Sequence, residues 1–178
     1  MNNHTDAHIL FIKRKLTHLG IPETHLLFKA LPLQSEPENL VSIGRDCVGQ
    51  IQRMEPLAAE AWQEMRKAAS GNNITLNPIS GFRSIAEQTA IIERKLSRGM
   101  PINDILKVIA PPGYSEHHTG QAIDISDGDN DDLTERFAES VSFKWLMKNA
   151  SLFNFTLSYP KNNSTGIAFE PWHWRFKE

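Results

Sequence analysis

Glycine and proline residues divide this chain into short segments, and this division restricts the folds open to it more than any other feature. Residues 31–53 are the clearest case, because Pro32, Pro37, Gly44 and Gly49 interrupt them. Proline removes a backbone hydrogen-bond donor and glycine weakens regular structure. We therefore expect short strands and turns in this region rather than helix.

Several of the segments between these breaks have apolar residues at helical spacing. In residues 133–149, for example, Phe137, Val141 and Trp145 recur at intervals of four residues. Ser84 and Glu87 form a capping-box pattern at the start of another such segment. We predict helices over residues 6–18, 56–70, 85–97, 101–109 and 133–149.

Other segments are short and apolar, as is typical of strands. We expect strands within residues 74–80, 120–126, 153–160, 166–170 and 172–176. The last three segments are predicted to form two or three antiparallel strands, with turns at Pro160–Gly166 and Pro171. Helices around a small antiparallel sheet define an α+β fold. The 178 residues suit a single domain, 1–178, and this small size favours a monomer.

Charge and hydropathy exclude two classes of partner. The net charge is -2 with neutral histidines, which does not favour nucleic acid or an anionic membrane surface. No segment approaches the roughly 20 apolar residues that a membrane-spanning helix needs. We therefore expect neither a nucleic-acid partner nor a membrane span.

Cysteine content and the N-terminal segment bear on the cellular compartment. Cys47 is the only cysteine, so an internal disulfide and a cysteine-rich zinc cluster are both excluded. The first 20 residues lack the basic and apolar regions of a secretory signal. This pattern predicts a cytoplasmic protein, or a periplasmic or envelope protein if the sequence is a trimmed part of a longer chain.

Two histidines and a carboxylate are candidates for a metal site. His117 and Asp124 are seven residues apart, with a turn at Gly120 between them that can bring them together, and His173 lies near the end of the chain. Two imidazoles, one carboxylate and an open position are typical of catalytic zinc. Asp124 lies between two isoleucines, where burial is costly unless the carboxylate is paired or metal-bound. The alternative is that each histidine is an ordinary surface or core residue, and spacing alone leaves both interpretations open.

Three motifs resemble those of the VanY-type D-alanyl-D-alanine carboxypeptidases. They are Ser-x-His-x-x-Gly-x-Ala-x-Asp at 115–124, Glu-Pro-Trp-His-Trp-Arg at 170–175, and Ser-Gly-Phe-Arg-Ser at 80–84 followed by Gln88. They lie within a motif-bearing core of about 74–176, whereas residues 1–73 contribute only a compatible pattern of helix and loop. His118 departs from the glutamine expected beside the first ligand, and Ser158 stands where many relatives have arginine.

The resemblance implies an α+β fold shared with hedgehog domains and a zinc peptidase that acts on bacterial cell-wall peptides. It implies one Zn²⁺ per chain, held by His117, Asp124 and His173, with Glu170 as general base. It also implies that Arg83 faces the substrate carbonyl.

The resemblance further implies that Gln88 and Ser115 line the substrate pocket and that Trp172 forms part of its wall. Some alternatives are open: Arg83 as an ion-pair partner of the following helix, Ser115 as a turn cap, and Tyr159 as a packing residue rather than a hydroxyl donor to substrate. His118 is interpreted as a neighbour of the site and not as a competing ligand.

The family includes enzymes that cut different bonds. The absent signal segment favours an L,D-carboxypeptidase that trims tetrapeptides to tripeptides during muropeptide recycling. A D,D-carboxypeptidase acting on pentapeptides, an L-alanyl-D-glutamate endopeptidase and a non-catalytic zinc-fold binding module are the alternatives. Glu170 separates the last of these, because a binding module needs no base beside its metal.

Overall fold

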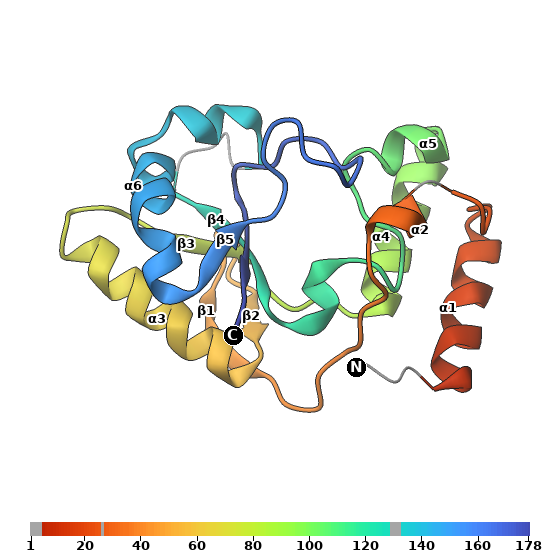
Figure 1. The fold of residues 1–178 in the computed structure, drawn as a ribbon, viewed down its shortest axis with the longest axis horizontal. Coiled ribbons are helices and arrows are strands. Elements are labelled where there is room, and N and C mark those ends of the chain that lie inside the picture. Colours follow the sequence, from red (N-terminus) through yellow and green to blue (C-terminus); the bar gives the residue numbers. More distant parts are fainter. Residues whose placement is uncertain (1–4, 26, 129–132) are drawn as a thin grey trace.

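The computed structural model describes residues 5–25, 27–128 and 133–178 and is shown in Figure 1. Its helices are α1 (Asp6–His18), α2 (Leu27–Ala30), α3 (Pro56–Ser70), α4 (Ile85–Ser97), α5 (Ile102–Ile105) and α6 (Val141–Asn149), with 3₁₀ helices η1 (Glu116–Thr119), η2 (Glu135–Glu139) and η3 (Ala150–Phe153). Its strands are β1 (Val41–Arg45), β2 (Ile51–Met54), β3 (Asn77–Ser80), β4 (Ala122–Ser126), β5 (Phe155–Leu157) and β6 (His173–Phe176).

A four-stranded antiparallel sheet in the order β3-β4-β6-β5 forms the centre of the fold. Strands β1 and β2 form a separate antiparallel hairpin. In the central sheet Asp124 pairs with His173 on one side and with Ser80 on the other. This register places two of the predicted metal ligands on adjacent strands, although they are far apart in the sequence. The predicted α+β fold with a small antiparallel sheet is confirmed.

The fold has two hydrophobic clusters, and Figure 1 shows α3 and α6 on one side of the central sheet and α1, α2, α4 and α5 on the other. The first contains residues of α3, α6 and the strands, including the fully buried Trp62. The second contains residues of α1, α2, α4 and α5, including Ile12, Ile92 and Ile105. Helix α4 begins where predicted, because Ser84 and Glu87 form the expected capping box.

Two predicted helices differ from the structure. The one expected over 101–109 is reduced to α5 (Ile102–Ile105). The helix expected over 133–149 is interrupted, because Ser140 adopts an extended conformation and its hydroxyl accepts a hydrogen bond from the Phe143 amide, capping a new helix. Of the two or three antiparallel strands predicted near the end of the chain, β5 and β6 form, and residues 166–170 do not form a third. Their amides bond elsewhere: that of Ala168 donates to the Lys107 carbonyl, and that of Glu170 donates to the Tyr159 carbonyl.

No helix within the described ranges is both long and apolar enough to cross a bilayer.

Candidate active site

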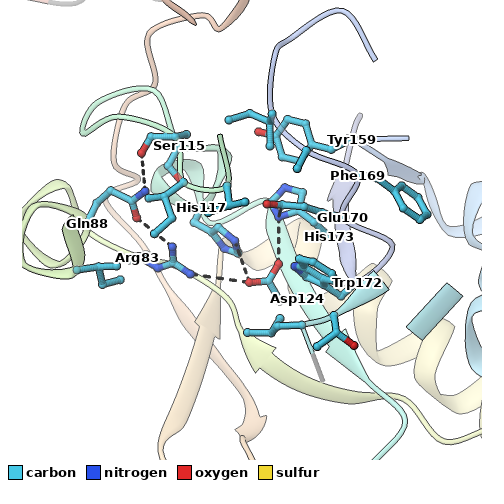
Figure 2. A pocket seen from close by; sticks show the side chains of 18 of the residues that line it. Arg83, Gln88, Ser115, His117, Asp124, Tyr159, Phe169, Glu170, Trp172 and His173 are labelled. Atoms are coloured by element: carbon cyan, nitrogen blue, oxygen red, sulfur yellow. Dashed lines mark hydrogen bonds and ion pairs between the residues drawn. The ribbon is translucent and has the colours of Figure 1, made fainter. Parts of the chain in front are cut away.

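A cavity of about 590 Å³ opens beside the central sheet and is lined by all nine residues that the sequence predicts for the site (Figure 2). These residues are Arg83, Gln88, Ser115, His117, Asp124, Tyr159, Glu170, Trp172 and His173. They come from the turn after β3, from α4, η1 and β4, and from the segment that ends in β6. The fold therefore brings together side chains separated by as many as 90 positions in the sequence.

The three predicted metal ligands have donor atoms that all lie within 4.8 Å of one another. His117, Asp124 and His173 are 4%, 5% and 3% exposed, respectively. A carboxylate and two imidazoles this close and this deeply buried are costly without a cation between them. The geometry thus favours a metal site over the alternative of ordinary core histidines.

The ring of His117 is oriented by the backbone. Its Nδ1 lies 2.7 Å from the Gly81 carbonyl oxygen, to which the Nδ1–H donates. Its Nε2 is 3.3 Å from Oδ2 of Asp124. A histidine ligand whose second nitrogen is fixed in this way presents the unprotonated nitrogen to the metal.

The ring of His173 is oriented by a carboxylate. Nε2 is 2.9 Å from Oε2 of Glu116, and Nδ1 is 3.0 Å from Oδ1 of Asp124. Glu116 also accepts a hydrogen bond from Nη1 of Arg175 at 3.2 Å. Glu116, which contacts both His173 and Arg175, is not among the site residues predicted from the sequence. Its position beside His117 was the available signal, because residues that support metal ligands are commonly close to them.

The electrostatics of the cluster favour a cation. Burial alone would raise the pKa of Asp124, but the two imidazoles hold it below its usual range. Burial also opposes ionisation of Glu116, yet the His173 hydrogen bond and the charge of Arg175 lower its pKa to about 2. Although burial disfavours a charged imidazole, the same two carboxylates raise the pKa of His173 to about 10. The oxygen and nitrogen donors and this negative surrounding fit one zinc ion.

Glu170 lies beside the three predicted metal ligands but is not part of the group that could hold the ion. Its Oε2 is 3.9 Å from Nδ1 of His173, and its backbone amide donates to the Tyr159 carbonyl at 3.1 Å. The residue is 8% exposed, and this burial raises the pKa of its carboxyl to about 7. A carboxylate in this position can exchange a proton near neutral pH.

The guanidinium of Arg83 is held at the opposite side of the cluster (Figure 2). Nη1 donates to Oε1 of Gln88 at 2.9 Å, and Nη2 donates to Oγ of Ser80 at 2.9 Å. Nη2 of Arg83 also lies 3.8 Å from Oδ2 of Asp124, which is a charged neighbour. In α4, by contrast, Arg83 bonds to the neutral side chain of Gln88. Arg83 therefore bonds to the following helix through an uncharged residue, and not through the ion pair that was the alternative interpretation.

The remaining predicted residues line the cavity in different ways. Gln88 donates to the Ala110 carbonyl at 2.7 Å while it accepts from Arg83, so its carboxamide holds the arginine. Ser115 precedes η1, but its side chain makes no capping hydrogen bond. Tyr159 stacks obliquely on His173, with 4.9 Å between the ring centroids. Trp172 is partly buried in the wall.

His118 does not line the cavity, and it is not in the group of described residues that could hold a metal ion. It is fully buried, and burial lowers the pKa of its imidazole to about 4. Both ring nitrogens are engaged by backbone groups of Arg83 and Gly113.

Comparisons with known proteins agree with this geometry. The family model for VanY D-alanyl-D-alanine carboxypeptidases matches residues 51–178. YodJ of Bacillus subtilis (strain 168) is 36% identical over 155 residues, which are 83% of this chain and 56% of YodJ. The bifunctional D-Ala-D-Ala dipeptidase and carboxypeptidase VanXYC of Enterococcus gallinarum is 31% identical over 129 residues, 69% of this chain and 66% of VanXYC. The chain thus spans between about half and two thirds of the length of these relatives.

Solved structures include two with the same fold and recognisable sequence similarity. The LdcB LD-carboxypeptidase has a TM-score of 0.72 at 35% identity, covering 83% of this chain and 72% of that one. A VanY D,D-pentapeptidase variant in complex with Zn(II) has a TM-score of 0.61 at 25% identity, covering 83% of this chain and 87% of that one. That relative binds Zn(II), and in this chain His117, Asp124 and His173 form a group that could hold such an ion. With more than half of its length matched by the family model, the chain belongs to the VanY family of D-alanyl-D-alanine carboxypeptidases.

Proposed function

We propose that this protein is a zinc carboxypeptidase that removes the C-terminal D-alanine from peptidoglycan stem peptides. One observation carries this proposal: a buried carboxylate, Glu170, and a fixed guanidinium, Arg83, face one cavity beside a group of two histidines and an aspartate. Metal ligands alone would suit a binding module, but a base and an anion-stabilising cation are what peptide hydrolysis requires.

His117, Asp124 and His173 would hold the zinc ion through Nε2, a carboxylate oxygen and Nδ1, because the other ring nitrogens are bonded to Gly81 and Glu116. Zinc bound by such ligands supplies Lewis acidity and lowers the pKa of water to about 7.

Glu170 would take a proton from the attacking water on its carboxylate and return it to the departing amine. The elevated pKa of this carboxyl suits both transfers at neutral pH. Arg83, which carries a permanent charge, would stabilise the negative oxygen that develops on the peptide carbonyl. The Gln88 and Ser80 hydrogen bonds keep the guanidinium in place before substrate arrives, so little reorganisation is needed.

For the bond that is cut, we propose the L,D type, in which a tetrapeptide becomes a tripeptide. The similarity to the LdcB LD-carboxypeptidase supports this choice, since identity and TM-score are both higher than for the VanY D,D-pentapeptidase. The cavity walls would contact the peptide through Ser115, Tyr159 and Trp172. A role in muropeptide recycling in the cytoplasm is part of the proposal, and fractionation of the source cells with an antibody tests it separately.

The decisive experiment is mass spectrometry of synthetic tetrapeptides and pentapeptides incubated with zinc-loaded protein. We expect loss of D-alanine from the tetrapeptide. Cleavage of the pentapeptide alone would support a D,D-carboxypeptidase instead, and cleavage between L-alanine and D-glutamate would support an endopeptidase.

The Glu170→Gln variant tests the catalytic base. We expect it to retain zinc while kcat falls by about 10²- to 10⁴-fold, the usual contribution of a general base. Glu60→Gln, at an exposed position on α3, is the matched control and is expected to have the wild-type rate. Zinc binding without turnover of any stem peptide by the wild-type protein would favour the binding module.

A further inference from the structure

His118 makes two hydrogen bonds in the protein interior, one through each ring nitrogen. Its Nδ1–H donates to the Arg83 carbonyl oxygen at 2.6 Å. Its Nε2 accepts from the Gly113 amide at 3.1 Å. Because the Gly113 amide can only donate, this pair of bonds requires the neutral imidazole with its proton on Nδ1. The side chain is fully buried, so water cannot replace either bond.

With the bond from His118, both backbone polar groups of Arg83 are hydrogen-bonded to η1. The Arg83 amide donates to the His117 carbonyl at 3.1 Å, and the Arg83 carbonyl accepts from His118. The turn after β3 is thus bonded to two consecutive residues of η1. Since η1 also carries the predicted ligand His117, these bonds set the position of the Arg83 backbone relative to the metal site.

The second bond of His118 joins η1 to Gly113, in the segment that leads into Ser115. Gly113 has a φ of +87°, and an added Cβ there would lie 2.6 Å from Cδ1 of Ile12 in α1. Its carbonyl accepts from the Gln34 amide at 2.8 Å. The Gly113 segment is therefore fixed on one side by the N-terminal region and on the other by His118.

We propose that His118 is a positioning residue, which acts through its two backbone hydrogen bonds to hold the Arg83 guanidinium at the reacting carbonyl. This inference rests on the proposed function, because it assumes that Arg83 stabilises the developing oxyanion. Displacement of a catalytic group by about 1 Å can cost on the order of 10²-fold in rate. His118 does not contact the cavity, so it affects the reaction only through the residues that it holds.

A pair of His118 variants separates hydrogen bonding from packing. His118→Leu removes both hydrogen bonds while it keeps an apolar side chain, and we expect kcat to fall about 10- to 100-fold with little change in KM or zinc content. The selective loss in kcat is expected because the oxyanion interaction forms only in the transition state. His118→Gln retains one donor and one acceptor and is expected to recover most of the activity. Equal losses in both variants would contradict the proposal.

A double-mutant cycle with Arg83→Ala tests whether His118 acts through the arginine. In the Arg83→Ala background we expect His118→Leu to change kcat by less than about 3-fold, because residues that act through one another are not additive. An unchanged effect of His118→Leu in both backgrounds would overturn the inference.

Nitrogen NMR of the wild-type protein is a further test and requires no enzymatic activity. We expect His118 to show a protonated Nδ1 and an unprotonated Nε2 at neutral pH. The opposite tautomer or an imidazolium would overturn the inference even if the protein is an active carboxypeptidase. The expected spectrum in a protein that cleaves no stem peptide would instead locate the failure in the proposed function.

Discussion

Two carboxylates in the cavity differ in their surroundings, and this difference favours different chemical roles. Asp124 lies between two imidazoles, which keep its pKa below the usual range and its oxygens free of protons. Glu170 has fewer compensating contacts, and burial raises its pKa to about 7. A permanently ionised carboxylate suits a metal ligand, and one that titrates near neutrality suits a base.

Substitution of Glu116 tests the support given to His173. Glu116→Gln replaces a charged acceptor by a neutral one at 2.9 Å from Nε2. We expect zinc affinity to fall on the order of 10- to 100-fold, as for other groups that orient histidine ligands. Competition with a chelator of known affinity measures the change. Glu64→Gln, at an exposed position on α3, serves as control, and equal affinities for both variants would contradict the assignment.

The sequence predicted polar and aromatic residues that line the cavity around the candidate metal site, but not its apolar lining, such as Val108 and Ile167, nor how the predicted residues are supported. The motifs contain Arg83, His117 and Asp124, so their proximity follows from recognising the motifs. The supporting contacts depend on strand pairing instead. Glu116 reaches His173 only because β4 and β6 are neighbours in the sheet.

At the scale of elements, helix boundaries were predictable where a capping residue coincided with a break in the apolar pattern. Helix α4 begins after Ser84 and α1 ends at His18, both as expected. The segment 133–149 kept its apolar spacing across Ser140, so periodicity could not reveal that this serine starts a new helix. Residues 166–170 have strand-like composition, but their amides bond to loops rather than to the sheet edge.

The capping box of α4 provides a prediction about stability. Ser84→Ala removes the hydroxyl that accepts from the Glu87 amide at 3.1 Å. We expect a loss of about 1 kcal/mol in the free energy of unfolding, which corresponds to a fall in Tm of about 2–4 °C for a chain of this size. Calorimetry measures the change, with Ser97→Ala near the other end of the helix as comparison. An unchanged Tm for Ser84→Ala would show that the cap contributes little.

At the scale of the whole molecule, the cavity is lined by members of both hydrophobic clusters, with Trp172 packed against the first and Tyr159 and Ile167 belonging to the second. The family model begins at residue 51, but the second cluster draws on earlier residues. Among the described residues, six of its thirteen buried members precede that position: Ile12, Leu16, Leu19, Ile21, Leu27 and Leu31. The N-terminal region, in which the sequence offered only a helix and loop pattern, thus helps to build one wall of the fold.

Removal of residues 1–50 is predicted to abolish cooperative folding. Each buried leucine or isoleucine contributes roughly 1.5–3 kcal/mol, so the loss of six approaches or exceeds the roughly 5–15 kcal/mol by which domains are stable. We expect the 51–178 fragment to bind a hydrophobic dye and to show no sharp thermal transition. A fragment that unfolds with the wild-type Tm would refute this prediction.

The two candidate histidine ligands also differ in how selection can act on them. The partner of His117 is the carbonyl of Gly81, a group that every residue type carries, so substitution cannot remove it and can only displace it. The partner of His173 is the side chain of Glu116, which a single codon change can shorten, neutralise or delete. Variation that adjusts metal affinity in descendants of this sequence is therefore expected at position 116. Position 81 is expected to resist change for a different reason, because a Cβ added there would clash with the Arg53 carbonyl oxygen.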